Sequence, residues 1–149
     1  MRLQKNTLLA LYSVLEFASD PQRHIPAAEI AAKYGVSPHH LAKVLADLAR
    51  AGIVESARGV GGGYRFAGNA RRLTLMDIVR RFEDIAPRSP GASSTSVERV
   101  LDTVLGEIDE NARATFSSIT IATMLRLIER QAVAAAAAKT SVPPRTRAG

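Results

Sequence analysis

The chain has 149 residues, of which 46% are hydrophobic, and a formal net charge of +6 with a pI near 10.3. This size fits one compact domain with a dimerising extension better than two independent cores. It contains no cysteine, which excludes disulfides, thiol switches and thiolate metal sites, and it has neither a membrane-length apolar run nor a signal-peptide core, so we expect a cytoplasmic protein without a membrane partner.

A first helix is predicted from about Leu3 to Ser19. Its apolar residues recur at helical spacing, and Asp20-Pro21 marks its end. The core face consists of Leu8, Leu11, Tyr12, Leu15 and Ala18. This face should pack beneath the elements that follow.

Two short helices joined by a tight turn are predicted next. The first spans Pro26 to Tyr34 and is closed by Gly35, while Ser37 and Pro38 provide the N-cap and first position of the second. The buried face of the second helix is formed by Leu41, Val44, Leu45 and Leu48. This arrangement is typical of a helix-turn-helix.

The polar residues of the second helix remain for water or for DNA; they are His39, His40, Lys43, Asp47 and Arg50. A zinc site at His39 and His40 is disfavoured, because adjacent helical residues diverge by about a hundred degrees and no carboxylate or thiolate accompanies them. They could be ordinary solvated residues. We favour groove contact, because the first turn of such a helix enters the major groove.

A glycine-tipped hairpin follows the second helix. Ile53 to Ala57 is expected to form a strand, Arg58 to Gly63 a flexible tip, and Tyr64 to Phe66 the return strand. Neither a Walker loop nor a dinucleotide-binding loop fits, since Tyr64-Arg65-Phe66 follows the last glycine. The hairpin therefore predicts a wing that approaches the sugar-phosphate edge, with Arg58 reaching the minor groove.

The positive charge is concentrated in the first half of the chain. Residues 1–82 hold 12 Lys and Arg against 6 Asp and Glu, whereas residues 83–149 hold 8 against 8. The half that contains the helix-turn-helix therefore carries the whole excess, as expected for a polyanionic partner.

The remainder of the chain divides into a capped helix, a linker and a helical region. Leu73 to Phe82 is predicted to be helical with Thr74 as its cap. We expect a DNA-binding domain over 1–84, a flexible linker over 85–96, a helical dimerisation region over 97–138 and a disordered tail over 139–149.

Apolar stripes in the last helical region need a covering surface. A second copy of the same region is the favoured partner, and packing onto the chain's own domain is the alternative. One stripe comprises Val97, Val100, Leu101, Val104, Leu105 and Ile108. The residues assigned to dimerisation in the second run are Phe116, Ile121, Leu125 and Ile128.

Four segments together resemble the Rrf2 family of bacterial transcription regulators, of the IscR, NsrR and CymR type. They are Met1-Arg2-Leu3, Leu48 to Val54, Ser56 to Tyr64, and Leu73 to Val79 continuing through Glu83. The wing pattern Arg-Gly-x-x-Gly-Gly-Tyr is the most specific of them. The resemblance implies a homodimeric winged helix with a long C-terminal dimerisation helix that binds an operator as repressor or activator.

The chain departs from this family where many relatives hold an iron–sulfur cluster with three cysteines. After Glu83 it offers Ser89, Ser93, Ser94 and Ser96, and serine hydroxyls are poor iron ligands. We therefore expect a cluster-free member with no cofactor. The sequence does not identify an effector, which could be a protein or a small molecule.

These patterns together predict a mainly α fold, a winged helix-turn-helix with a two-stranded β wing and a long C-terminal dimerisation helix. The predicted function is that of a homodimeric, sequence-specific DNA-binding regulator, a repressor on a palindromic operator; the alternative is a protein-interaction module, and no catalytic constellation is present. The expected DNA contacts are Ser37, Pro38, His39, His40, Lys43, Arg58, Gly59, Val60, Gly61, Gly62 and Tyr64, with Arg2 and Lys5 adding backbone contacts.

Overall fold

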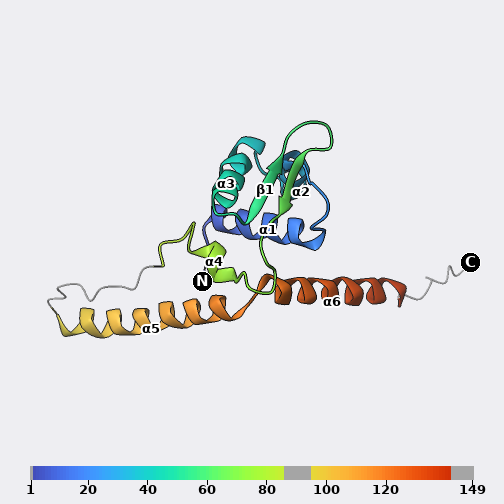
Figure 1. Ribbon diagram of the computed structural model, residues 1–149. Coiled ribbons are helices and arrows are strands. Elements are labelled where there is room, and N and C mark those ends of the chain that lie inside the picture. Colours follow the sequence, from blue (N-terminus) through green and yellow to red (C-terminus); the bar gives the residue numbers. More distant parts are fainter. Residues whose placement is uncertain (1, 86–94, 142–149) are drawn as a thin grey trace, which may run out of the picture.

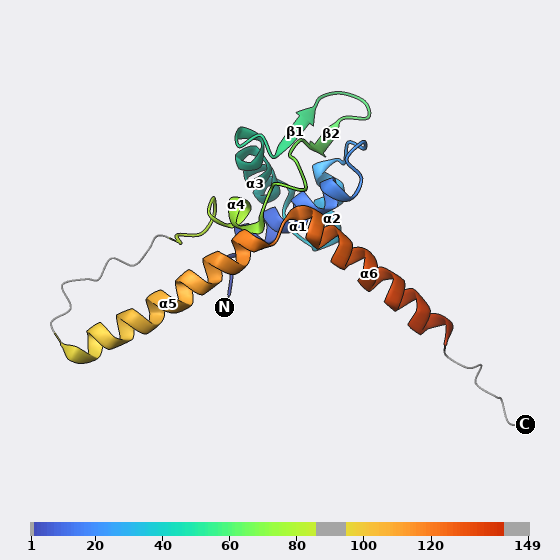
Figure 2. The ribbon, with the colours of Figure 1, turned by 60° about the horizontal axis from the view of Figure 1, so that its bottom comes forward.

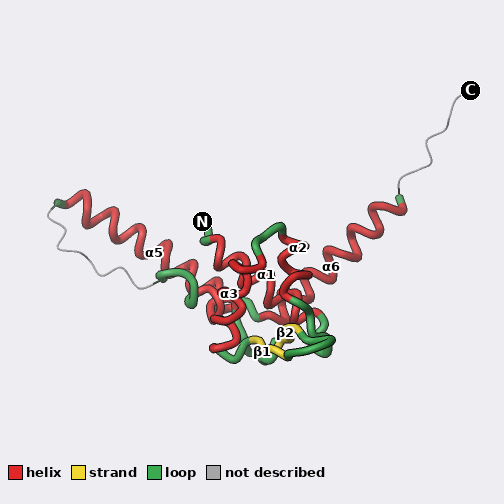
Figure 3. Tube along the Cα trace, turned by 90° about the horizontal axis from the view of Figure 1, so that it is seen from above, coloured by secondary structure: helices red, strands yellow, loops and turns green. Residues whose placement is uncertain are grey.

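The computed structural model describes residues 2–85 and 95–141. A small body is formed by four helices and a two-stranded hairpin, and two long helices leave it in opposite directions (Figure 1). Figure 2 shows that these two helices meet at an angle beneath the body, and Figure 3 shows the body lying between them. The predicted linker lies almost entirely outside the described residues.

The fold is mainly helical, as predicted. In chain order the elements are α1 Lys5–Ser19, α2 Ala27–Tyr34, α3 Pro38–Arg50, β1 Val54–Ala57, β2 Gly63–Phe66, α4 Leu75–Val79, α5 Ser96–Ser118 and α6 Ile121–Thr140. The two apolar runs of the last helical region form two long helices, which are separated at Ile119 and Thr120.

The helix-turn-helix forms as its local signals predict. Gly35 ends α2 in the left-handed conformation, and the Ser37 side chain accepts a hydrogen bond from the backbone N–H of His40, with Pro38 as the first helical residue. Pro26 is the N-cap of α2 rather than its first residue. The turn is therefore specified by residues that satisfy the helix ends.

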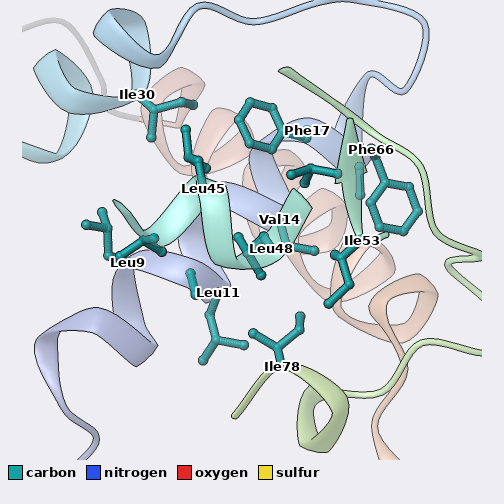
Figure 4. Packing of buried hydrophobic residues seen from close by; sticks show 14 of the residues in the cluster. Leu9, Leu11, Val14, Phe17, Ile30, Leu45, Leu48, Ile53, Phe66 and Ile78 are labelled. Atoms are coloured by element: carbon teal, nitrogen blue, oxygen red, sulfur yellow. The ribbon is translucent and has the colours of Figure 1, made fainter. Parts of the chain in front are cut away.

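One hydrophobic core joins α1, α2, α3, the hairpin and α4. The predicted apolar face of α3 lies in it, with Leu41, Leu45 and Leu48 fully buried. Figure 4 shows Leu45 and Leu48 packed among side chains such as Phe17 of α1 and Ile53 and Phe66 of the hairpin. The core fixes α3 on α1, so the exposed face of α3 has a defined direction.

The hairpin is attached to the body by a pairing that its own sequence does not reveal. The strands β1 and β2 are antiparallel, from Val54 opposite Phe66 to Ala57 opposite Gly63. Ile25, just before α2, pairs with Tyr64 through two backbone hydrogen bonds of 2.8 and 2.9 Å. This third backbone segment holds the wing against the helix-turn-helix.

A polar cluster ties α2 to α1. The Glu16 carboxylate accepts a hydrogen bond from the Tyr34 hydroxyl and pairs with Lys33, and the Tyr34 ring stacks on Tyr12 at 4.8 Å between centroids. Burial acts to raise the pKa of Glu16, but the bonds from Lys33 and Tyr34 outweigh it, and the pKa lies below its ordinary value of 4.5. Burial, together with the neighbouring Glu16 carboxylate, raises the pKa of Tyr34.

We expect the free energy of unfolding of Glu16→Gln to fall less steeply than that of the unaltered chain as the pH is lowered. Because the pKa of Glu16 is lower in the folded chain, its charge stabilises the fold above the unfolded pKa, and this contribution is lost as the pH falls through the folded value. Lys33 is 56% exposed, so the effect near neutral pH should be only about 1 kcal/mol. Urea denaturation between about pH 7 and pH 3 measures it. A variant whose stability falls as steeply as that of the unaltered chain would contradict the assignment.

A carboxylate that follows α4 supplies the cap of α1. Gln4, the N-cap residue, makes no side-chain cap of its own. The Glu83 carboxylate accepts a 2.6 Å hydrogen bond from the Gln4 backbone N–H and another of 2.6 Å from the buried Thr7 hydroxyl. A carboxylate at a helix N-terminus is favourable for the helix dipole, so this contact joins α1 to the start of the predicted linker.

The junction of α5 and α6 is anchored on the segment before α4. Leu75 donates a backbone hydrogen bond to Ile119, and Ile121 donates one to Leu73, each of 2.9 Å. Ile121 is fully buried in the core of its own chain. The assignment of Ile121 to a dimer surface was therefore wrong, since a side chain enclosed by its own domain has no area left for a second copy.

Candidate nucleic-acid interface

The start of α3 and the tip of the wing lie at the same end of the body, on the side away from α5 and α6 (Figure 1). The loop between β1 and β2 projects beyond the helices there. Two features separated in the sequence thus form one face, which we call the recognition face: residues 37–43 of α3 and its cap, and residues 58–62 of the wing.

The first turns of α3 present an exposed row of side chains. Ser37, Pro38, His39 and Lys43 are all exposed, as the sequence predicts. Ala42, which sequence reasoning passed over, is exposed beside them. Its spacing of three residues from His39 places it on the same helical face, and a methyl group there leaves room for close approach to a base.

His40 differs from its neighbours. Its ring is half-buried, and its Nε2 atom is buried without a hydrogen-bond partner in the described part of the chain. Because the Nε2 atom is buried, it is not free to contact a base in this placement. The backbone N–H of His40 instead completes the Ser37 cap and so helps to start α3.

The tip of the wing adopts a defined turn in the structure. Gly62 donates a 3.0 Å backbone hydrogen bond to Gly59, and Gly61 has a φ of +75°. A bond of this span with a positive φ at the third residue is characteristic of a type II turn. Val60 therefore occupies the second position of a defined turn.

Arg58 is the free cation of the wing. Arg65 is paired with Glu55 across the two strands, whereas Arg58 is exposed and has no ion pair with any residue of 2–85 or 95–141. The net charge that the wing offers to a phosphate backbone is thus concentrated at Arg58, at the base of the turn.

Tyr64 positions the wing instead of facing outward. Its ring lies 6.2 Å from that of Phe17, and its backbone pairs with Ile25. The half-buried side chain packs against the core. Its predicted role in DNA contact is corrected accordingly: the aromatic ring fills the joint between the hairpin and α1.

Arg2 and Lys5 lie apart from the recognition face. Arg2 lines a small cavity of about 170 Å³ together with Glu83 and with Asp109 and Phe116 of α5. That places the start of the chain beside α5, at the end of the body opposite the wing (Figure 1). The structure therefore does not bring Arg2 and Lys5 to the DNA contacts predicted for them.

No metal centre is visible in the residues that the structure describes. Across 2–85 and 95–141 no three His, Asp or Glu side chains gather in a way that could hold an ion. Over the same residues no helix is long and apolar enough to cross a membrane.

Comparison with protein families identifies a match over most of the chain. Residues 3–127 match the Rrf2 family, described as an iron-dependent transcriptional regulator. Among curated proteins, the HTH-type transcriptional regulator BadM of Rhodopseudomonas palustris is 50% identical over 133 residues, which cover 88% of this chain and 85% of BadM.

Solved structures show the same architecture. CymR, the global cysteine regulator of B. subtilis, superposes with a TM-score of 0.73 at 23% identity, covering 85% of this chain and 98% of that chain. IscR of T. potens has a TM-score of 0.73 at 25% identity, covering 88% and 90%. The winged helix-turn-helix and the long C-terminal helices are thus shared features of the fold.

Proposed function

The chain belongs to the Rrf2 family of HTH-type DNA-binding transcriptional regulators and is not an enzyme, and from that premise we propose that it binds a palindromic operator as a homodimer and represses transcription. The observation that carries the proposal is the recognition face, where the exposed start of α3 and the tip of the wing, which contains the exposed and unpaired Arg58, lie at the same end of the body.

Each copy would place α3 in a major groove and the wing in the adjacent minor groove. His39, Ala42 and Lys43 are the exposed side chains in position to reach base edges or phosphates. A two-fold dimer sets two such helices on half-sites about one helical turn, roughly 34 Å, apart.

An exposed apolar stripe on α5 supports the homodimer. None of the α5 side chains is buried in the single chain. Val97 is 76%, Val100 is 65% and Ile108 is 56% exposed, with Leu101 and Val104 between them on the same helical face. A contiguous apolar surface of this kind is unusual on a monomer. The stripe, together with exposed Leu127, Ile128 and Val133 of α6, is the proposed dimer surface.

Two further residues assigned to dimerisation have a mixed environment. Phe116 and Leu125 are half-buried and pack against the core of their own chain. Ile128 is exposed. The proposed surface therefore rests on α5 and on the part of α6 beyond the core, and Phe116 and Leu125 lie at its inner edge.

The family description includes dependence on iron, but the residues of this chain do not support iron–sulfur cluster binding. A cysteine-held cluster requires thiolates, and this chain has none. The serines that stand in the corresponding segment at 89, 93 and 94 lie outside the described residues. We therefore propose regulation without an iron–sulfur cluster, by an effector of unidentified chemistry or by abundance alone.

Arg58→Ala should weaken operator binding about tenfold and leave the fold intact. The side chain is exposed and unpaired, so its removal costs no internal contact, and the loss of one phosphate or minor-groove contact reduces the salt slope of binding by about one unit. Fluorescence anisotropy with duplexes selected from a random pool, at several salt concentrations, measures both quantities.

The matched control for this experiment is Arg71→Ala. Arg71 is exposed and follows Ala70, whose carbonyl accepts a backbone hydrogen bond from Ala122 at the start of α6, so the control removes the same net charge away from the recognition face. Equal affinity of the Arg58 variant and the unaltered chain would remove the wing from the interface. Absence of any salt-dependent duplex binding would favour the protein-interaction alternative.

A further inference from the structure

The most exposed large apolar side chain lies at the tip of the wing. Val60 has 110% of its reference exposure, more than any other large hydrophobic residue in the described ranges 2–85 and 95–141. A valine that touches nothing in its own chain contributes nothing to the core, and a β-branched residue gains nothing from a turn position. Its apolar character therefore has no role in folding.

The wing holds Val60 at a fixed distance from the body. Val54 and Phe66 at the base of the hairpin are buried, and the paired strands extend about 10 Å from that point to Ala57 and Gly63. The Gly59 to Gly62 hydrogen bond then closes the turn. Val60 is thus presented beyond the last strand pair, with Arg58 beside it.

We propose, on the basis of the DNA-binding function above, that Val60 reads the minor groove by excluding the 2-amino group of guanine. A·T and T·A pairs show only acceptors in the minor groove, whereas G·C adds the N2 amino donor. The isopropyl group offers no acceptor. Contact with guanine would therefore strip water from a donor and give it no partner, which is unfavourable.

The neighbouring groups favour the same base pairs. Arg58 is attracted to a narrow minor groove, and such grooves occur in A·T-rich segments. With Val60 rejecting the amino group and Arg58 attracted by the narrow groove, each half-site should contain A·T pairs where the wing lies. This specificity does not require any hydrogen bond from the wing to a base.

Modified bases separate the effect of the minor-groove 2-amino group on binding from the effect of the rest of the base sequence. In an operator selected from a random duplex pool, adenine at each flanking position is replaced in turn by 2,6-diaminopurine, which adds the minor-groove amino group and keeps the pair. The same positions are also tested with G·C and with inosine·C, which restores a minor groove without that group. We expect diaminopurine and G·C at the wing positions to weaken binding about tenfold, and inosine·C to bind as A·T does.

Val60→Thr tests whether this side chain is responsible. Threonine has nearly the same shape, but its hydroxyl can accept a bond from the amino group, so the tenfold discrimination should fall to about threefold or less. The matched control is Val60→Ile, which keeps a β-branched apolar side chain without an acceptor at the same position and should keep the discrimination.

The outcomes separate this inference from the proposed function. Tight, sequence-dependent binding that ignores the added amino group at every position overturns the role of Val60 alone, as does unchanged discrimination in Val60→Thr. A chain that prefers no duplex sequence overturns both proposals.

Discussion

Gly63→Ala is expected to lower the free energy of unfolding by about 3 kcal/mol and to abolish operator binding. A Cβ at this position would lie 2.6 Å from the carbonyl carbon and oxygen of Ile25 and 2.8 Å from the nitrogen of Pro26. These are backbone atoms in a segment paired with Tyr64, so they cannot move aside without breaking that pairing. The φ of +151° adds strain for any residue with a side chain.

The effect on DNA binding follows from the joint between the wing and α2. If Ile25 and Tyr64 separate, the wing no longer has a fixed position relative to α3, and the two halves of the recognition face cannot engage adjacent grooves together. Urea denaturation measures the stability change, and anisotropy with the selected duplex measures binding.

Gly61→Ala is the matched control in the same loop. Its φ is +75°, but a Cβ there would meet no atom within 4 Å. Only the backbone strain of about 1 kcal/mol applies. If the two variants lose the same stability, the close contact with Ile25 is not what fixes the wing, and the explanation given for the joint is wrong.

Val104→Glu is expected to raise the dimer dissociation constant at least about 100-fold. Val104 lies in the middle of the α5 stripe and is 47% exposed in the single chain. In the proposed dimer its side chain would be covered, and an unpaired carboxylate buried there is strongly unfavourable. Because each copy carries one recognition helix, affinity for a two-half-site operator should fall with dimerisation.

Sedimentation equilibrium of the full chain measures the association, and Thr103→Glu is the control. Thr103 is exposed and lies about a hundred degrees around α5 from Val104, outside the apolar stripe, so the same charge there should leave the dimer intact. Dissociation by both variants would point to general destabilisation of α5. An unaltered chain that sediments as a monomer would overturn the homodimer itself.

The elements of the body could be predicted because their signals are local. The serine and proline at 37 and 38 satisfy the start of α3 wherever that helix packs, and the reciprocal bonds of Thr74 and Asp77 do the same for α4. The hairpin follows from glycines between two short β-prone runs. These signals act within a few residues, so one sequence suffices to interpret them.

The predictions that the structure corrects share one cause: they depend on contacts between residues that are far apart in the sequence. Periodicity shows that Ile121 belongs to an apolar face, but it does not show whether that face meets the chain's own core or a second copy. His40 and Tyr64 were assigned to DNA contact by their neighbours in sequence, whereas in the structure the Nε2 atom of His40 is buried and the Tyr64 side chain packs against the core. Glu83 caps α1 by bonding to Gln4, which is 79 positions away, and to Thr7, which is 76 positions away. No local sequence pattern predicts these contacts.

The amino-acid sequence by itself determined the helix-turn-helix, the wing, the basic half and the absence of thiolate chemistry, because caps, turns and charges act through neighbouring residues. The tertiary structure alone decided which of those side chains share a face. It brought the tip of the wing to the same end of the body as the start of α3, placed Arg2 beside α5 and enclosed Ile121. Side-chain direction depends on what packs behind each residue, and that is settled only when distant segments meet in one core.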